Sequence, residues 1–193
     1  KCAALAENKY GALKKYNRIL FMTLGTGIGG AVIINGNLLE TGEYPGCEFG
    51  HMVIKENGLK CNCGRKGCFE KYGSMRVFKD NLRNELWLED KTSGKELMAI
   101  LKDTTKESKD YAKIEKVRKQ YIRDLSVGIA NLVNIFEPEA IGIGGSFVYF
   151  SEVLLQDVKK TILKEDMLFN PRKEINIQTA VLGNEAGIIG ATL

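Results

Sequence analysis

RILFMTLGTGIGGAVII, residues 18–34, is the stretch of the sequence that decides the fold. Its first seven residues are an apolar run with a polar segment before it and glycines after it, which predicts a buried strand over residues 18–24. The glycines lead directly into a second apolar run over residues 31–34, which Asn35-Gly36 follows. Asn-Gly is a strong signal for a tight turn of a β-hairpin. We therefore predict two antiparallel strands on either side of a glycine-rich segment.

Gly25, Gly27 and Gly30 fit the spacing of the dinucleotide-binding fingerprint Gly-x-Gly-x-x-Gly, but the sequence around them does not. That fingerprint needs a helix after the glycines, so that the pyrophosphate lies at the helix N-terminus, and here a strand follows. No Gly-Lys-Ser/Thr ends the segment, so it is not a Walker loop either. A hairpin this rich in glycine lets backbone N–H groups approach an anion, and Thr26 would add a hydroxyl donor. A tight, bulged hairpin without a ligand is the alternative that the spacing leaves open.

The rest of the chain predicts an α/β domain with a mixed sheet. Residues 1–11 read as the end of a helix, and residues 41–74 as a long glycine-rich loop, which in a compact domain is usually functional or held by a ligand. The apolar periodicity then predicts, in order, helices over residues 75–86, 95–101 and 108–136, a strand over 140–143, a helix over 151–163, a strand over 175–181 and a helix from Glu185. The order of elements is an opening hairpin followed at the end by β-α-β-α.

His51 is the only histidine, and it precedes three clustered cysteines in the order His-x9-Cys-x-Cys-x4-Cys. The imidazole of His51 and the thiolates of Cys61, Cys63 and Cys68 would make a closed tetrahedral site of the kind that holds structural Zn²⁺. A metal would also explain how so long a loop stays ordered, because zinc binding and local folding are coupled. Free thiols beside an unrelated histidine are the alternative.

Two carboxylates stand beside these candidate ligands: Glu48 lies three residues before His51, and Glu70 lies two residues after Cys68. On a loop fixed by a metal, both could accept hydrogen bonds from the hydroxyls of a sugar. They could instead form the acid and base pair of a glycosidase, which the sequence does not decide because it does not give their separation. Ordinary surface glutamates are the third possibility.

Composition and charge narrow the class of protein. The 193 residues are 44% hydrophobic and 27% charged, which is typical of a soluble globular domain and long enough for one core. The net charge is +4, and the densest run of charges, residues 102–119, mixes both signs, which favours a solvated helix face over a nucleic-acid-binding surface. No apolar stretch approaches the roughly 20 residues needed to cross a bilayer. Five cysteines, an odd number, suit metal ligation in a reducing compartment, so we expect a cytoplasmic protein.

Taken together, these segments resemble the ROK family of sugar kinases and repressors, which has the actin-like ATPase (ribonuclease H-like) fold. LGTGIGG at residues 24–30 resembles the family's second phosphate loop, and GCEFGH at residues 46–51 resembles its sugar loop. CNCGRKGCFE at residues 61–70 matches its zinc signature at every fixed position. IGIGGS at residues 141–146 resembles the adenosine motif, and LGNEAGIIGA at residues 182–191 the closing helix.

The resemblance implies a sugar kinase of the glucokinase or fructokinase type that uses ATP with Mg²⁺, contains structural zinc and forms a homodimer. A sugar-sensing repressor of the same family is the alternative, and a winged-helix segment upstream would decide for it. Under either reading a hexose would contact Glu48, His51 and Glu70, with His51 also a zinc ligand. ATP would bind through Gly25, Thr26, Gly27, Gly29, Gly30, Gly144 and Gly145.

The front of the chain departs from the family pattern. Family members carry an Asn-Asp pair before an Ala-rich helix, and residues 1–7 match the segment just after that Asp. The catalytic base, taken to be this Asp, is therefore expected immediately upstream of Lys1, and the Asp-x-Gly-Gly-Thr phosphate loop of the N-terminal domain is absent as well. We expect residues 1–193 to be a single domain, the C-terminal nucleotide- and sugar-binding half of a ROK protein, which alone does not phosphorylate a sugar.

Overall fold

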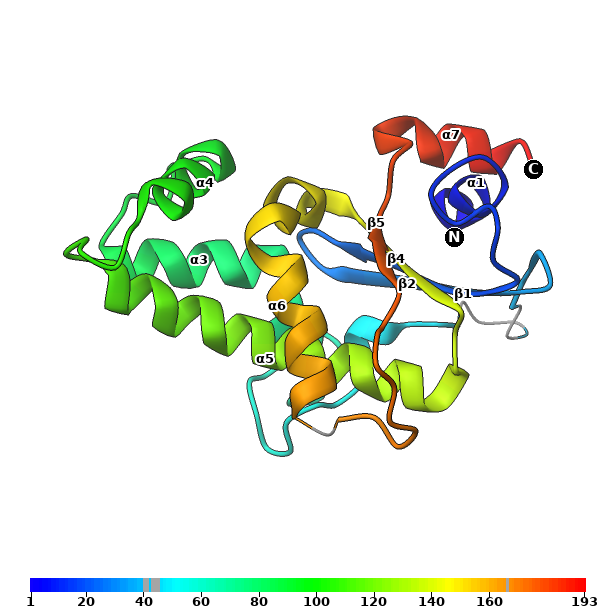
Figure 1. Ribbon diagram of the computed structural model, residues 1–193, viewed down its shortest axis with the longest axis horizontal. Coiled ribbons are helices and arrows are strands. Elements are labelled where there is room, and N and C mark those ends of the chain that lie inside the picture. The colour runs from blue at the N-terminus through cyan, green and yellow to red at the C-terminus, as the bar shows by residue number, and fades with distance from the viewer. Residues whose placement is uncertain (40–41, 43–45, 166) are drawn as a thin grey trace.

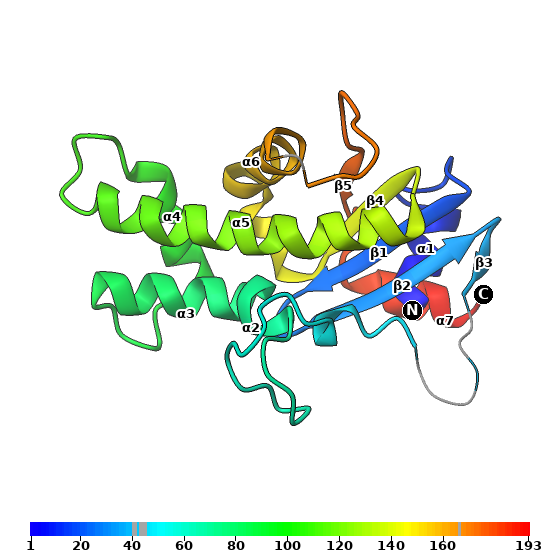
Figure 2. The same ribbon diagram turned by 90° about the horizontal axis from the view of Figure 1, so that it is seen from below.

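The computed structural model describes residues 1–39, 42, 46–165 and 167–193. A mixed sheet of five strands lies at its centre, with α1 (Cys2–Lys9) and α7 (Ala186–Ala191) on one face and α5 (Tyr111–Phe136) on the other (Figures 1 and 2). The strands stand in the order β3-β2-β1-β4-β5. Their bounds are β1 Arg18–Leu24, β2 Ile28–Ile34, β3 Asn37–Leu38, β4 Ala140–Gly144 and β5 Ile177–Thr179. The predicted α/β class with a mixed sheet is confirmed.

The glycine hairpin, which consists of β1, β2 and the three residues between them, forms as the sequence predicts. β1 and β2 are antiparallel and close with Leu24 opposite Ile28. β2 begins three residues earlier than the predicted residues 31–34, because Ile28–Gly30 continue the pairing with β1. Asn35 and Gly36 both have positive φ, 53° and 77°, as a two-residue turn with right-handed strand twist requires, and this turn joins β2 to β3.

The strands parallel to β1 point their carboxyl ends to one edge of the sheet. β1 is parallel to β4, and β4 is parallel to β5. β5 is shorter than the predicted residues 175–181, and beyond its carboxyl end the N–H groups of Val181 and Leu182 donate to the carboxylate of Glu7, at 2.8 Å each. Glu7 is fully buried, so this contact ties α1 to the segment that follows β5.

The helices follow the periodicity of the sequence. α3 (Met75–Leu86) has the predicted bounds, and Ser74 caps it by accepting from the N–H of Val77. α4 (Gly94–Asp103), α5 and α6 (Ser151–Lys164) differ from the predictions by a few residues at their ends. The predicted loop over residues 41–74 lies partly outside the described residues; within it are the short α2 (Glu70–Gly73) and a 3-10 turn, Phe49–His51. Two further 3-10 segments are Gly145–Phe150 and Gly183–Glu185.

Successive side chains of β1 point to opposite faces of the sheet, so the core is divided into two apolar clusters, one on each face. Leu20, Met22 and Leu24 pack in the larger apolar cluster with α3, α5 and α6, whereas Ile19 and Phe21 pack toward α1. On that second face, α1 and α7 approach so closely that a Cβ on Gly190 would overlap the carbonyl oxygen of Cys2. The two chain ends therefore lie side by side on one face (Figure 1).

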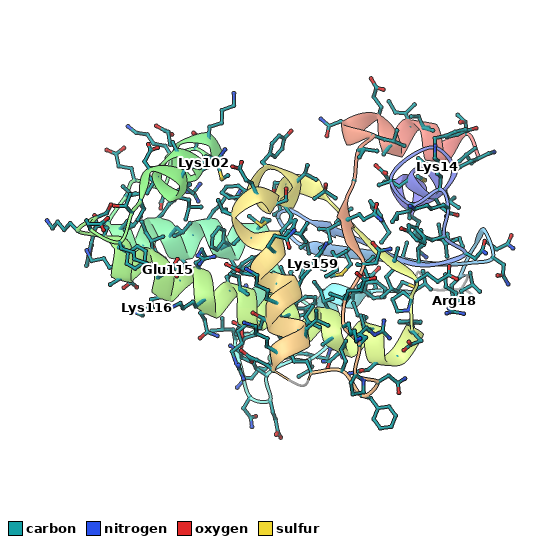
Figure 3. All side chains as sticks on the ribbon, viewed as in Figure 1. Lys14, Arg18, Lys102, Glu115, Lys116 and Lys159 are labelled. Atoms are coloured by element: carbon teal, nitrogen blue, oxygen red, sulfur yellow. The ribbon has the colours of Figure 1, made fainter. Side chains whose placement is uncertain are left out.

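Charged side chains of both signs surround the helices, as the run over residues 102–119 predicts (Figure 3). Lys102 on α4 lies 2.6 Å from Glu152, and Lys116 on α5 lies 3.1 Å from Glu85. Exposed pairs of this kind contribute little to stability and mark a solvated face. In the part of the chain that the structure describes, no helix combines the length and the apolar character that a membrane crossing requires.

Candidate functional site

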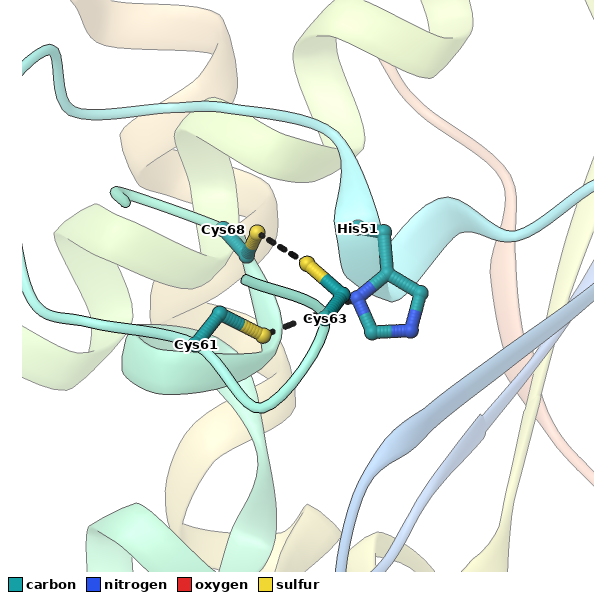
Figure 4. A group of neighbouring side chains, drawn as sticks. All are labelled: His51, Cys61, Cys63 and Cys68. Carbon is teal, nitrogen blue, oxygen red and sulfur yellow. Dashed lines mark hydrogen bonds between the residues drawn. The ribbon is translucent and has the colours of Figure 1, made fainter. Parts of the chain in front are cut away.

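The four predicted metal ligands converge on one point (Figure 4). The Nδ1 atom of His51 lies 3.7 Å from the sulfur of Cys61, and the sulfurs of Cys63 and Cys68 are 3.6 Å apart. All four ligand atoms lie within 4.8 Å of one another. Zn–S bonds of about 2.3 Å in a tetrahedron separate two sulfurs by about 3.8 Å, so the spacing fits a single tetrahedral ion.

The metal loop, residues 51–70, can bring these ligands together because glycines allow its turns. Gly64 and Gly67 have φ of 89° and 79°, a region that other residues rarely adopt. A Cβ on Gly67 would overlap the carbonyl oxygen of Lys55. Between the ligands, the N–H of Cys61 donates to the carbonyl of Arg65 at 2.8 Å, and the N–H of Gly64 donates to Cys61 at 3.0 Å.

The environment of two of the thiols differs sharply. Hydrogen bonding from the backbone N–H of Arg65, helped by its guanidinium, lowers the pKa of the exposed Cys63 to about 6. Burial is the main reason that the pKa of Cys68 rises to about 12. A divalent cation at the centre of the cluster would favour the thiolate at each sulfur and override the effect of burial.

The metal loop is anchored on α5. The ring of Phe69 is fully buried and occupies the space that a Cβ on Gly128 of α5 would fill. Lys55 forms a 2.8 Å ion pair with Asp124 of α5, whose side chain is only 9% exposed. These two contacts fix the loop against α5, and a loop that is already fixed loses less conformational freedom when it binds a ligand.

Glu70 connects the metal loop to the glycine hairpin. Its Oε2 atom accepts a hydrogen bond from the backbone N–H of Ile28 at 3.0 Å. The same oxygen occupies the place where a Cβ on Gly27 would lie, so the carboxylate needs glycine at this position. One oxygen of Glu70 is therefore committed to the hairpin.

The segment with Glu48 and His51 packs along β2. A Cβ on Gly30 would overlap the ring of Phe49, and a Cβ on Gly50 would come within 2.6 Å of the carbonyl oxygen of Ile28. Glu48 lines a cavity of about 200 Å³, the small cavity, whose other lining residues are Lys1, Phe21, Thr23, Gly29, Gly30 and Ala31. Of the three predicted sugar ligands, Glu48 lines this cavity and His51 and Glu70 do not.

A second cavity of about 520 Å³, the large cavity, lies at the carboxyl ends of β1, β4 and β5. In open α/β sheets this edge is where ligands bind, and the volume is within the usual range for small-molecule pockets. Gly144 and Gly145 line it; Gly145 has φ of 75°, and a Cβ there would lie 2.7 Å from the carbonyl oxygen of Leu24. The opposite part of its lining comes from the end of β5 and from residues 183–187.

The predicted nucleotide ligands lie in three places: the large cavity, the small cavity, and the three residues between β1 and β2. Gly144 and Gly145 line the large cavity, and Gly29 and Gly30 line the small one. Gly25, Thr26 and Gly27 line neither of these two cavities: Gly25 accepts from the N–H of Arg76 at 3.1 Å, and Gly27 lies under Glu70.

Phe21 and Thr23 line both cavities, and the reasoning from sequence missed them. Thr23 is an exposed polar residue between buried residues of β1, one residue before the Leu-Gly that opens the glycine segment. This position beside the glycine segment was the feature of the sequence from which Thr23 could have been identified. The two cavities become neighbours only because Thr23 is paired with Gly29 on one side and Gly144 on the other.

Relatives of this chain include both sugar kinases and repressors. Glucokinase from Streptomyces coelicolor is 31% identical over 98% of this chain and 62% of its own length, and glucokinase from Thermotoga maritima is 30% identical over 97% and 61%. The xylose repressor of Bacillus spizizenii is 30% identical over 82% of this chain and 39% of its own length. The chain thus spans about three fifths of the glucokinases it matches.

Solved structures of sugar kinases are also similar to this chain. The ROK family glucokinase from Streptomyces griseus, in complex with glucose and AMPPNP, superimposes with a TM-score of 0.83 and 27% identity, over 98% of this chain and 64% of that one. The ROK hexokinase from Thermus thermophilus gives a TM-score of 0.77 and 29% identity, over 98% and 60%. These neighbours are sugar kinases of the actin-like ATPase fold. The sequence profile of the ROK family matches residues 1–193 from end to end, and the chain belongs to the ROK family.

Proposed function

We propose that the protein is an ATP-dependent hexose kinase and that these residues supply its nucleotide site, one wall of its sugar site and a structural zinc centre. The observation that carries the proposal is that Phe21 and Thr23 line both cavities. A phosphate donor in the large cavity and an acceptor hydroxyl in the small cavity would meet across these two side chains. Holding two reactants in this way is, together with electrostatic stabilisation, the basis of rate enhancement in phosphoryl transfer.

On the nucleotide side, the backbone at Gly144 and Gly145 and the hydroxyl of Thr23 would contact the phosphates of ATP. Mg²⁺ bound with ATP would neutralise charge that develops on the transferred phosphoryl group. The acceptor oxygen forms a bond to the γ-phosphorus, the bond to the β-γ bridging oxygen breaks, and ADP leaves. The hydroxyl proton passes to a general base.

On the sugar side, the carboxylate of Glu48 would accept hydrogen bonds from hydroxyls, since Glu48 lines the small cavity. His51 presents Nδ1 to the sulfur of Cys61, which leaves Nε2 for a hydroxyl, and Glu70 has one oxygen that is not bonded to Ile28. The zinc would be structural, because four protein ligands leave no position for a substrate. Its role is to hold His51 and Glu70 beside the hairpin.

The general base stays a prediction. Lys1 lines the small cavity, so an Asp immediately before it would lie at the sugar. We also propose that these residues are the C-terminal half of the kinase and that the enzyme is a cytoplasmic homodimer. Light scattering on the protein with its complete natural chain measures the oligomeric state.

The test of the kinase proposal is sugar-dependent release of ADP by the protein with its complete natural chain, across glucose, fructose, N-acetylmannosamine and β-glucosides. We expect one or more of these to be phosphorylated. Glu48→Gln should raise KM for the sugar and leave the KM for ATP nearly unchanged. No sugar-dependent ADP release with any of them would refute the proposal.

A sugar-sensing repressor is the second candidate, favoured by the similarity to the xylose repressor. In that case the same cavities would bind an effector without turnover. Sugar binding in calorimetry, with no ADP release and with a change in DNA affinity, would select this function over the kinase.

A further inference from the structure

Lys55 lies where the first and last residues of the metal loop run side by side. Two residues before it, Val53 pairs with Cys68 in an isolated antiparallel bridge. The N–H of Lys55 donates to the carbonyl of Gly67 at 3.3 Å, and a Cβ on Gly67 would lie only 1.7 Å from the carbonyl oxygen of Lys55. Gly67 directly precedes Cys68, and His51 is four residues before Lys55. The backbone at Lys55 therefore fixes how the segment with His51 lies against the segment with Cys68.

The ammonium group of Lys55 meets a carboxylate that the core of the protein holds in place. Asp124 lies on α5 and is only 6% exposed, and its Oδ1 atom is 2.8 Å from the Nζ atom of Lys55. Among the residues that the structure describes, Lys55 is the one cation within ion-pairing distance of Asp124. A carboxylate buried this deeply is costly without a positive partner. The pair therefore ties the middle of the metal loop to a long helix.

Tyr72 receives the same ammonium group on its aromatic face. The Nζ atom of Lys55 lies 4.3 Å from the centre of the Tyr72 ring, a cation–π contact. The hydroxyl of Tyr72 accepts a hydrogen bond from the N–H of Leu59 at 2.6 Å, and a Cβ on Gly58 would lie 2.1 Å from that hydroxyl. Tyr72 is in α2, two residues after Glu70. One side chain, that of Lys55, thus connects the metal loop, α2 and α5.

We propose that Lys55 and Asp124 are the positioning pair of the metal loop, which sets the affinity of the cluster for Zn²⁺ and, through Glu70 and His51, the KM for the sugar. The statement about the sugar rests on the proposed function, and the statement about zinc does not. Neither side chain belongs to the cluster of ligands or lines one of the two cavities. The pair acts through the backbone of Lys55 and through Tyr72.

The experiment uses the protein with its complete natural chain and compares the wild type with Lys55→Met, Asp124→Asn and the double variant. Met keeps the length of the lysine stem without its charge, and Asn keeps the shape of Asp. Lys60→Met is the matched control, because Lys60 is an exposed lysine of the same loop. Competition with a fluorescent chelator measures the Kd for Zn²⁺, urea unfolding of the zinc-saturated protein measures its stability, and steady-state kinetics measure the two KM values.

Contacts that orient metal ligands typically change metal affinity by about 10- to 100-fold, and we expect about 10-fold weaker Zn²⁺ binding in Lys55→Met and in Asp124→Asn. The double variant should bind no more weakly than the weaker of the two single variants, because the two residues act as a unit. Lys55→Arg, which keeps the charge, should restore most of the affinity, and Lys60→Met should bind Zn²⁺ as the wild type does. With zinc saturating, Lys55→Met should raise the KM for the sugar by about 3-fold or more and leave the KM for ATP nearly unchanged.

An unchanged Kd for Zn²⁺ in Lys55→Met together with a lower stability would show that the pair only stabilises the fold, and the proposal would be wrong. An equal loss of affinity in Lys60→Met would assign the effect to the net charge of the loop, which also overturns it, as does a wild type that binds no Zn²⁺. If Lys55→Met does not fold, Asp124→Asn decides by the same criteria. Weaker zinc binding as expected, but no phosphorylation of any sugar by the wild type, would refute the kinase and leave the positioning of the metal loop intact.

Discussion

The carboxylate of Glu70 accepts a hydrogen bond from the backbone N–H of Ile28 at 3.0 Å. Glu70 is the last residue of the metal loop, and Ile28 is the first residue of β2 in the glycine hairpin. The bond joins two segments that are 42 residues apart in the chain. Order in the metal loop is thereby coupled to the position of the hairpin between the two cavities.

Removing the metal should loosen the loop. We expect about one Zn²⁺ per chain in protein purified without chelator, and its loss in Cys68→Ser, because zinc needs the thiolate of this buried ligand. A loss of about 3 kcal/mol would lower Tm by roughly 6–12 °C in a chain of this size. Elemental analysis and calorimetry measure both effects. Cys47→Ser, which changes a cysteine outside the cluster, is the control and should keep the metal.

Gly27→Ala should displace Glu70. The added methyl group would overlap the Oε2 atom of Glu70, and the bond to Ile28 would be lost. We expect a destabilisation of about 1–3 kcal/mol, measured by urea unfolding. Gly25→Ala is the matched control for stability, because nothing lies within 4 Å of its Cβ position. Equal effects of the two substitutions would contradict the coupling.

The thiol of Cys63 should be reactive at a lower pH than an ordinary cysteine in metal-free protein. Its pKa is lowered to about 6 from the ordinary 9.0, so the thiolate forms as pH rises through about 6. A lowered pKa in the folded state adds stability that is present above pH 9 and is lost as pH falls through about 6. Rates of iodoacetamide labelling, followed by mass spectrometry, should rise with a midpoint near pH 6 at Cys63. Cys68, with a pKa of about 12, should stay unlabelled near neutral pH. A midpoint near pH 9 at Cys63 would argue against the role of the Arg65 backbone.

Glu7→Ala should be among the most destabilising single changes outside the metal loop. The buried carboxylate accepts from the N–H groups of Ala12, Val181 and Leu182, and Ala would leave these donors unsatisfied. Each unsatisfied donor costs about 1–3 kcal/mol, so we expect a total of about 3 kcal/mol or more. Glu7→Gln keeps an oxygen for Val181 and Leu182 and should lose less. Calorimetric Tm values of the two variants give the comparison, and a Tm for Glu7→Ala equal to that of the wild type would exclude this role.

The sequence was sufficient to predict the ends of an element where particular residues end a strand or begin a helix. β1 and α3 have the predicted bounds, since glycines end the strand and Ser74 begins the helix. The convergence of the four candidate metal ligands was also predictable, because three of the four lie within eight residues of one another and His51 is the only histidine. The carboxyl end of β5 was not predictable, because Glu7, more than 170 residues away, accepts from the N–H groups of the last predicted residue and the next.

By itself, the sequence determined the class of fold, the family and the set of candidate metal ligands, since strand runs, turn residues and clustered cysteines are local features. Only the tertiary structure decided that Phe21 and Thr23 line both cavities and that Glu70 bonds to Ile28. The physical reason is that each of these depends on packing between segments far apart in the chain. No periodicity within a single segment records which backbone N–H or which cavity a distant side chain will meet.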